Sequence, residues 1–128
     1  MTIDYARAAD LLERYRVARE TFDGDGWVAI FTEDAEYHDG PFAPPFIGHN
    51  GLRTFLLVSA ETQRDVDFTV ERHWVSGSTV LAAWHMSSTD RSRGDVARVG
   101  GFLTMDIASD GRIDRLREWW MMAPTTNG

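Results

Sequence analysis

The stretch VDFTVERHWVSGSTVLAAWHMSS, residues 66–88, decides the fold, because it reads as two strands joined by a tight turn. Both halves are rich in β-branched and aromatic residues, and the Ser76-Gly77 pair between them is typical of a hairpin. Two more stretches of similar composition follow, with Asp110-Gly111 as a second tight turn. The sequence therefore predicts four strands, over Val66–Val75, Thr79–Ser88, Val96–Ile107 and Arg112–Met121.

The residues before this stretch recur with the period of a helix. Apolar side chains on one face predict an amphipathic first helix from about Ile3 to Phe22, and either Asp23 or Asp25 could cap a short second helix after it. That second helix would carry Trp27, Ile30 and Phe31.

A third helix is predicted to begin near Gly48, with Leu52, Phe55 and Leu56 on one face. Between the second and third helices, Ala35–His38 reads as a short strand, and Pro41–Phe46 reads as an irregular loop because proline cannot donate to a strand ladder. Helices followed by an antiparallel meander indicate one α+β domain over residues 1–128, with three N-terminal helices packed on one face of a curved, mainly antiparallel sheet.

The composition excludes several classes of chemistry. The chain of 128 residues contains no cysteine, which excludes disulfides, thiolate nucleophiles and cysteine-bound metals. Its 13 basic residues are all arginine, so a lysine Schiff base is excluded too. Because the net charge is −7 and no basic patch is concentrated, we expect no nucleic-acid partner. No apolar run approaches the roughly 20 residues that cross a bilayer, and residues 1–20 lack the apolar core of a signal peptide. We therefore expect a cytoplasmic protein with no membrane partner.

Asp39 and Tyr15 are the first candidates for chemistry. Asp39 leaves a short strand beside Gly40 and Pro41, which places its carboxylate at the rim of a cavity, and Tyr15 on the inner face of the first helix could donate a hydrogen bond into the same cavity. A carboxylate facing a phenol suggests proton transfer on a small, mostly apolar molecule. The alternatives are an aspartate that caps a turn and a tyrosine that packs in the core.

Glu118 is a third candidate. Strict alternation in the last strand puts Leu116, Glu118 and Trp120 on one face, and Glu118 projects into the pocket if that face is concave. It could then act as general acid beside the Asp39 base. The alternative is a structural salt bridge to an arginine such as Arg98 or Arg16.

Two histidines, His85 and His38, are candidates for a general base or for metal ligands. Alternation puts Trp84 and Met86 on one face of the second strand and His85 on the other, although a shift by one residue would turn His85 inward. His38 points away from its neighbour Asp39. No compact ligand spacing links these residues, so we expect no metal.

The chain resembles the SnoaL-like and ketosteroid-isomerase-like members of the nuclear-transport-factor-2-like (NTF2-like) superfamily. The resemblance runs through FDGDGWVAIFTEDAEYHDG (residues 22–40), the third helix at Gly48 and DGRIDRLREWW (residues 110–120). It implies a cone-shaped half-barrel with one deep pocket, often a homodimer joined through the outer sheet face. It also implies that Asp39 occupies the place of the proton-shuttling aspartate and Tyr15 that of the oxyanion-hole tyrosine. The place of the second oxyanion donor, a protonated aspartate in the isomerases, is taken by Leu103, which argues against 3-oxosteroid isomerisation itself.

The resulting hypothesis is a cofactor-independent acid–base enzyme of isomerase, cyclase, dehydratase or epoxide hydrolase type. Its catalytic residues would be Asp39, Tyr15 and Glu118, and the ligand a small hydrophobic molecule, flat and in some cases polycyclic. The alternative is a non-catalytic ligand-binding or dimerisation module, whose outer face would carry aromatic residues. Residues assigned to ligand binding are Trp84, Trp120, Phe42, Phe46, Met86, Leu103, Met105 and His85.

Overall fold

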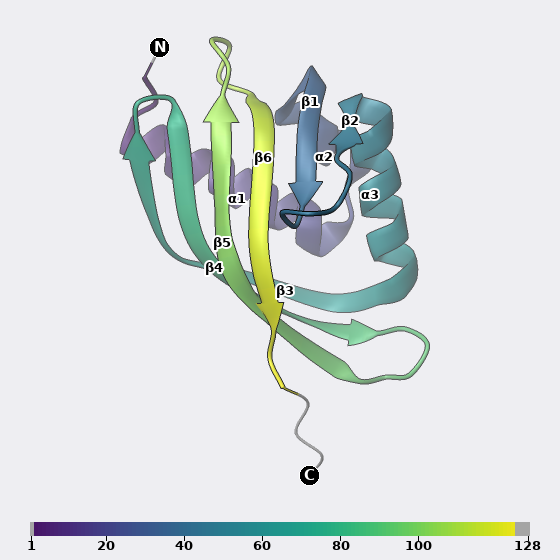
Figure 1. Ribbon diagram of the computed structural model, residues 1–128. Helices are drawn as coiled ribbons and strands as arrows, with labels where there is room; N and C mark the ends of the chain where they lie inside the picture. The colour runs from purple at the N-terminus through teal and green to yellow at the C-terminus, as the bar shows by residue number, and fades with distance from the viewer. Residues whose placement is uncertain (1, 125–128) are drawn as a thin grey trace.

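The computed structural model describes residues 2–124, in which three helices cover one face of a six-stranded sheet (Figure 1). This arrangement confirms the predicted α+β class. The elements in chain order are α1 (Tyr5–Thr21), α2 (Gly24–Ala29), β1 (Phe31–Asp39), β2 (Phe46–Ile47), α3 (Gly48–Thr62), β3 (Gln63–Ser76), β4 (Thr79–Asp90), β5 (Val96–Ile107) and β6 (Ile113–Met122).

Aspartate caps set the start of the first two helices. The side chain of Asp4 accepts a hydrogen bond from the backbone N–H of Arg7 at 2.8 Å, so α1 begins at Tyr5 and not at Ile3. Asp23 caps α2 in the same way. The α2 helix is shorter than predicted, because Ile30 is its C-cap and Phe31 already belongs to β1.

The sheet has the order β2-β1-β6-β5-β4-β3, and β1 lies parallel to β6 while all other neighbours are antiparallel. The predicted bounds of β5 are confirmed, β3 and β4 extend further than predicted, and β6 begins and ends one residue later than predicted. Both predicted tight turns place glycine in the left-handed region, with φ 61° at Gly77 and 87° at Gly111. Residues 40–45 form the irregular loop, and β2 is a two-residue strand after it.

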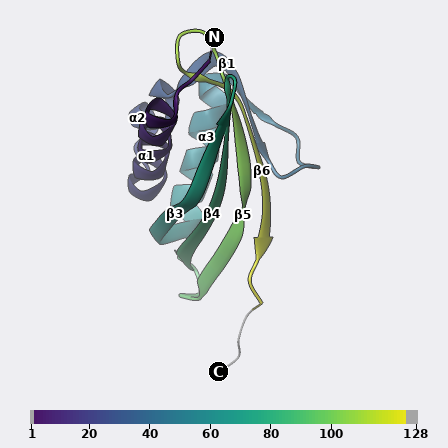
Figure 2. The same cartoon turned by 90° about the vertical axis from the view of Figure 1, so that its left-hand side faces the viewer.

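All three helices lie on the same side of the sheet, as the turned view in Figure 2 shows. The core between the layers holds Trp27 in contact with Phe31, Tyr15 and Tyr37, with ring centroids 4.9 to 5.9 Å apart. The lower parts of β3, β4 and β5 bend round toward the end of α3 (Figure 1).

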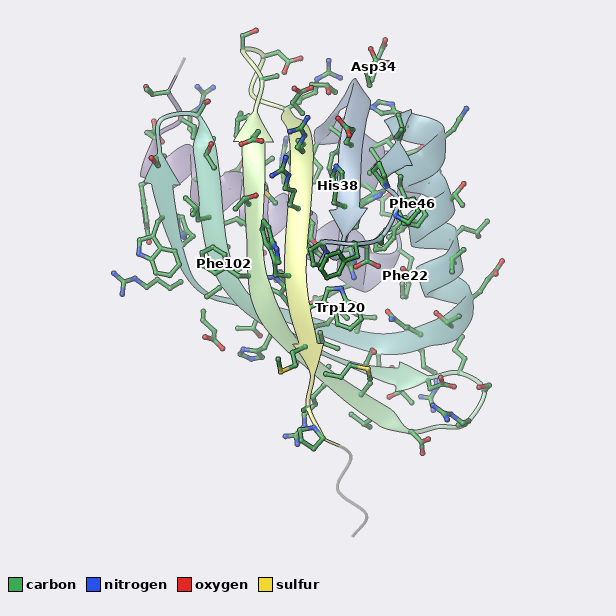
Figure 3. The ribbon with its side chains drawn as sticks, viewed as in Figure 1. Phe22, Asp34, His38, Phe46, Phe102 and Trp120 are labelled. Carbon is green, nitrogen blue, oxygen red and sulfur yellow. The ribbon has the colours of Figure 1, made fainter. Side chains whose placement is uncertain are left out.

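The convex face of the sheet carries its own aromatic side chains. Trp74 and Phe102 pack together with ring centroids 5.8 Å apart, and Trp119 lies opposite Phe102 on the neighbouring strand. Trp74 and Trp119 are 37% and 40% exposed. Phe102 is visible on this face in Figure 3. Within residues 2–124, no helix has the length and apolar character needed to cross a bilayer.

Candidate active site

A pocket of about 210 Å³ opens between the concave face of the sheet and the helices α1 and α3. We call this cavity the Glu118 pocket. Its wall combines a few polar groups with aromatic and sulfur-containing side chains. Its lining includes Arg19, Asp39, Phe55, Trp84, Met86, Glu118 and Trp120.

Two carboxyl groups lie side by side in this wall. The parallel pairing of β1 with β6 sets Asp39 opposite Glu118 in register. Neighbouring strands are about 4.8 Å apart, and both side chains line the same pocket. The two carboxyls therefore line one cavity from adjacent positions, although they are 79 positions apart in the sequence.

Glu118 is held from behind by polar side chains of α1. It is 3% exposed, and the hydroxyl of Tyr15 donates a hydrogen bond to its Oε1. Arg19 Nη1 donates in turn to the Tyr15 hydroxyl at 2.9 Å and lies 3.8 Å from Glu118 Oε1. Tyr15 is fully buried and does not line the pocket, so it contacts Glu118 and not the cavity.

Burial is the largest influence on the pKa values of Glu118, Tyr15 and Tyr37. Removal from water raises the pKa of Glu118 above its ordinary value, and the charge of Arg19 and the phenols of Tyr15 and Tyr37 only partly offset the shift. Burial likewise raises the pKa of Tyr15 and of Tyr37 well above the ordinary range for a phenol. Glu118 thus favours its neutral, proton-donating form more than an exposed glutamate does.

The raised pKa predicts a pH-dependent stability. The folded protein keeps the Glu118 proton above the ordinary pKa of 4.5, where the unfolded chain has lost it, so the free energy of unfolding falls as the pH rises from 4.5 toward the raised pKa. Denaturant unfolding of the wild type and of Glu118→Gln across that range measures this. The free energy of unfolding of the variant should fall less steeply with pH than that of the wild type. If it falls equally steeply in both proteins, the pKa of Glu118 is not raised.

Asp39 lies at the mouth of the pocket. It is half-buried and accepts a hydrogen bond from the indole Nε1 of Trp120 at 3.0 Å. Gly40 follows with φ 103°, a conformation that favours glycine and turns the chain into the proline loop. Trp120 lies beside this loop in Figure 3. Trp120 therefore fixes the orientation of the carboxylate.

The predicted ligand-binding residues divide into two groups. Trp84, Met86 and Trp120 line the pocket. The others lie elsewhere: Phe42 is 98% exposed on the proline loop, Phe46 packs against the core, and Leu103 and Met105 are fully buried.

His85 lies on the convex face, as the alternation of β4 predicts when Trp84 faces inward. Its Nδ1 is 2.7 Å from Glu71, and half of its side chain is exposed. His38 Nε2 lies 3.3 Å from Glu36 Oε1 on β1. Across residues 2–124, no three His, Asp or Glu side chains gather as metal ligands would.

Arg19 is a residue of the site that was not predicted from the sequence. The predicted partners of Glu118 were Arg16 and Arg98, but Arg16 pairs with Glu13 and Glu20 on the surface of α1. The spacing in the sequence could have indicated it, because Arg19 follows Tyr15 by four residues and therefore lies on the same face of the helix.

A comparison with protein families matches residues 12–116 to the SnoaL-like domain. The chain belongs to the SnoaL-like domain family. No curated protein sequence matches this SnoaL-like domain significantly.

Solved structures show the same fold, which is NTF2-like. The epoxide hydrolase/cyclase-like enzyme SalBIII, from polyether salinomycin formation, superposes with a TM-score of 0.82 and 18% identity over 92% of this chain and 93% of its own. A Mycobacterium tuberculosis protein in complex with estradiol-17beta-hemisuccinate superposes with a TM-score of 0.80 and 19% identity, over 92% of this chain and 98% of its own. The Δ5-3-ketosteroid isomerase of a Mycobacterium species superposes with a TM-score of 0.79 and 21% identity, over 93% of this chain and 98% of its own. At these identities the likeness establishes the fold alone.

Proposed function

We propose that this SnoaL-like domain is a cofactor-independent acid–base enzyme of isomerase, cyclase, dehydratase or epoxide hydrolase type. The observation that supports the proposal is the pair Asp39 and Glu118, which line one pocket from neighbouring strands in different surroundings. Asp39 is half-buried at the mouth and Glu118 is buried with a raised pKa. Two carboxyls whose environments differ in this way can divide the roles of base and acid.

Each residue has a defined role in this proposal. Asp39 accepts a proton from the substrate, and Glu118 gives its proton to the oxygen on which negative charge develops. Tyr15 acts through Glu118 and is a positioning residue, because its hydroxyl contacts that carboxyl and lies outside the pocket lining. The cycle closes when Asp39 returns its proton to a carbon of the product and the product oxygen gives its proton back to Glu118, or when both carboxyls exchange their protons with water.

The position of Leu103 also favours Glu118 as the acid. The family resemblance places a second oxyanion donor at Leu103, a residue that has no polar atom in its side chain. In the sheet, Leu103 pairs directly with Glu118 on β6. Glu118 therefore supplies a carboxyl on the strand next to the position where the resemblance puts that donor.

The proposed ligand is compact and mostly apolar. A volume of about 210 Å³ lies below the roughly 300–1,000 Å³ of pockets that enclose drug-sized ligands, which favours one or two rings over four. The steroid derivative bound by the M. tuberculosis neighbour and the cyclase-like chemistry of SalBIII support an apolar ring compound as the substrate class.

Proton exchange tests the reaction class without knowledge of the natural substrate. A panel of one- and two-ring ketones would be incubated with the protein in D₂O, and deuterium uptake beside the carbonyl followed by NMR. We expect uptake that requires both Asp39 and Glu118 and that survives Arg117→Gln, a substitution on the exposed side of the same strand. Tight binding of panel compounds that are all recovered unexchanged would instead identify a binding module.

We also propose a homodimer joined through the convex sheet face, where Trp74, Phe102 and Trp119 form an exposed aromatic patch. Sedimentation at micromolar concentration is expected to give a dimer for the wild type and a monomer for Phe102→Glu, because a buried charge would lack a partner. Leu57→Glu, at a position 61% exposed on α3, should remain dimeric. A monomeric wild type would contradict this interface.

A further inference from the structure

Arg19 is a buried cation in the wall of the Glu118 pocket. It lies in the last turn of α1, is 6% exposed and contributes to the pocket lining. Its guanidinium group lies over the Phe55 ring, 5.0 Å from the ring centroid. Arginine remains charged in a protein interior, so a full positive charge is present here.

The hydrogen bonds of Arg19 are unevenly shared between its two terminal nitrogens. Nη1 donates to the hydroxyls of Tyr15 and Tyr37, at 2.9 and 3.3 Å. Within residues 2–124, Nη2 finds only the sulfur of Met86 at 3.7 Å, and a thioether is a weak acceptor. A guanidinium has five N–H donors that match the two oxygens of a carboxylate, so the Nη2 side is free to bind a better acceptor.

Glu118 does not accept a hydrogen bond from the Nη2 side of Arg19. Its Oε1 lies 3.8 Å from Nη1, beyond hydrogen-bond distance, and the Tyr15 hydroxyl stands between the two groups. Burial raises the pKa of Glu118, which reduces the negative charge available to balance Arg19. Phe55, Trp84 and Met86 in the wall supply no counter-charge, and the remaining carboxyl of the lining is Asp39 at the mouth, whose charge helps to raise the pKa of Arg19.

We propose that Arg19 binds a carboxylate carried by the substrate, with the two oxygens on the Nη2 side of the guanidinium in place of the Met86 sulfur. This inference names the substrate class for the function proposed above: a compact apolar acid whose ring system lies between Arg19 and the pocket mouth. Asp39 lies at that mouth, where it is more exposed than Arg19 and accepts from Trp120. The charge of Asp39 helps to raise the pKa of Arg19, and Asp39 pairs in register with Glu118. The substrate carboxylate is therefore assigned to the Nη2 side, where the Met86 sulfur lies.

Calorimetry with a matched pair of compounds tests the proposal on the intact protein. At neutral pH 2-naphthoic acid is an anion, and 2-naphthamide is a neutral molecule of nearly the same shape. We expect the acid to bind at least about tenfold more tightly than the amide, because a charge-assisted bond to arginine is stronger than a neutral one. Equal affinity, or no binding of the acid at millimolar concentration, would overturn the proposal.

Variants assign the preference to Arg19. Arg19→Gln is expected to abolish the preference for the acid, Arg19→Lys to keep part of it, and Arg117→Gln on the outer face to keep all of it. If Arg19→Gln does not fold, the wild-type comparison and Arg19→Lys still decide the question. Because binding is measured without turnover, a carboxylate preference without proton exchange would refute only the enzymatic proposal. Exchange on neutral ketones without that preference would refute only the carboxylate site.

Discussion

Glu118→Gln is expected to lower kcat by about 10²–10⁴-fold on any compound that the wild type turns over, with a much smaller change in KM. The amide has nearly the shape of the carboxyl and can still accept the Tyr15 hydrogen bond, so the pocket should keep its form. The amide lacks an acidic proton, because its N–H groups are far too weakly acidic to protonate the substrate oxygen. Steady-state kinetics would show the loss in kcat, and a preserved unfolding transition would show that the fold is intact.

Asp39→Asn is the companion variant, because it removes the base and keeps the acceptor for Trp120 Nε1. We expect a loss of similar size, again in kcat. The double variant should lose little more than either single one, because residues that act as a unit have non-additive effects. Full turnover in either single variant would refute the division of roles between the two carboxyls.

Gly101→Ala is expected to be the most damaging conservative change in the sheet. A Cβ atom at this position would lie 2.0 Å from the carbonyl oxygen of Trp119 and 2.9 Å from the Cα of Trp120, which are backbone atoms of β6. Neither can move without opening the β5–β6 pairing. Overpacking of this kind costs roughly 1–3 kcal/mol, occasionally more, and would be measured as a lower denaturant midpoint.

Gly100→Ala is the matched control on the preceding residue. The nearest atom to its added Cβ is the Trp84 carbonyl oxygen at 3.9 Å, an ordinary contact, so we expect near-wild-type stability. The Gly101 change should also disturb the site, since Trp120 is its cross-strand partner and holds Asp39. Equal stability of the two variants would show that β6 adapts more easily than the backbone geometry implies.

Much of the fold could be predicted because its signals are local. The bounds of β5 follow from its run of β-branched and aromatic residues, and the two turns follow from glycines that accept a positive φ. The first strand was underestimated, because Phe31 was assigned to the preceding helix. Apolar residues at a helix end fit either element when only neighbouring residues are considered.

The site was predicted less completely. The alternation along β6 predicted that Glu118 shares a face with Leu116 and Trp120. In the structure Glu118 is buried and lines the pocket. The alternation could not show that Tyr15 lies behind Glu118 and outside the cavity, or that Arg19 provides the buried charge. Phe42 was assigned to the pocket from its place in the proline loop, yet that loop carries its ring into solvent.

The amino-acid sequence by itself determined the class of each main element and the face on which most side chains of the strands lie, because period and turn chemistry act over a few residues. Only the tertiary structure decided which groups meet. The parallel pairing of β1 with β6 sets Asp39 beside Glu118, and the packing of α1 on the sheet brings Arg19 and Tyr15 to the same carboxyl. Such contacts depend on burial and register between distant segments, and no local pattern encodes them.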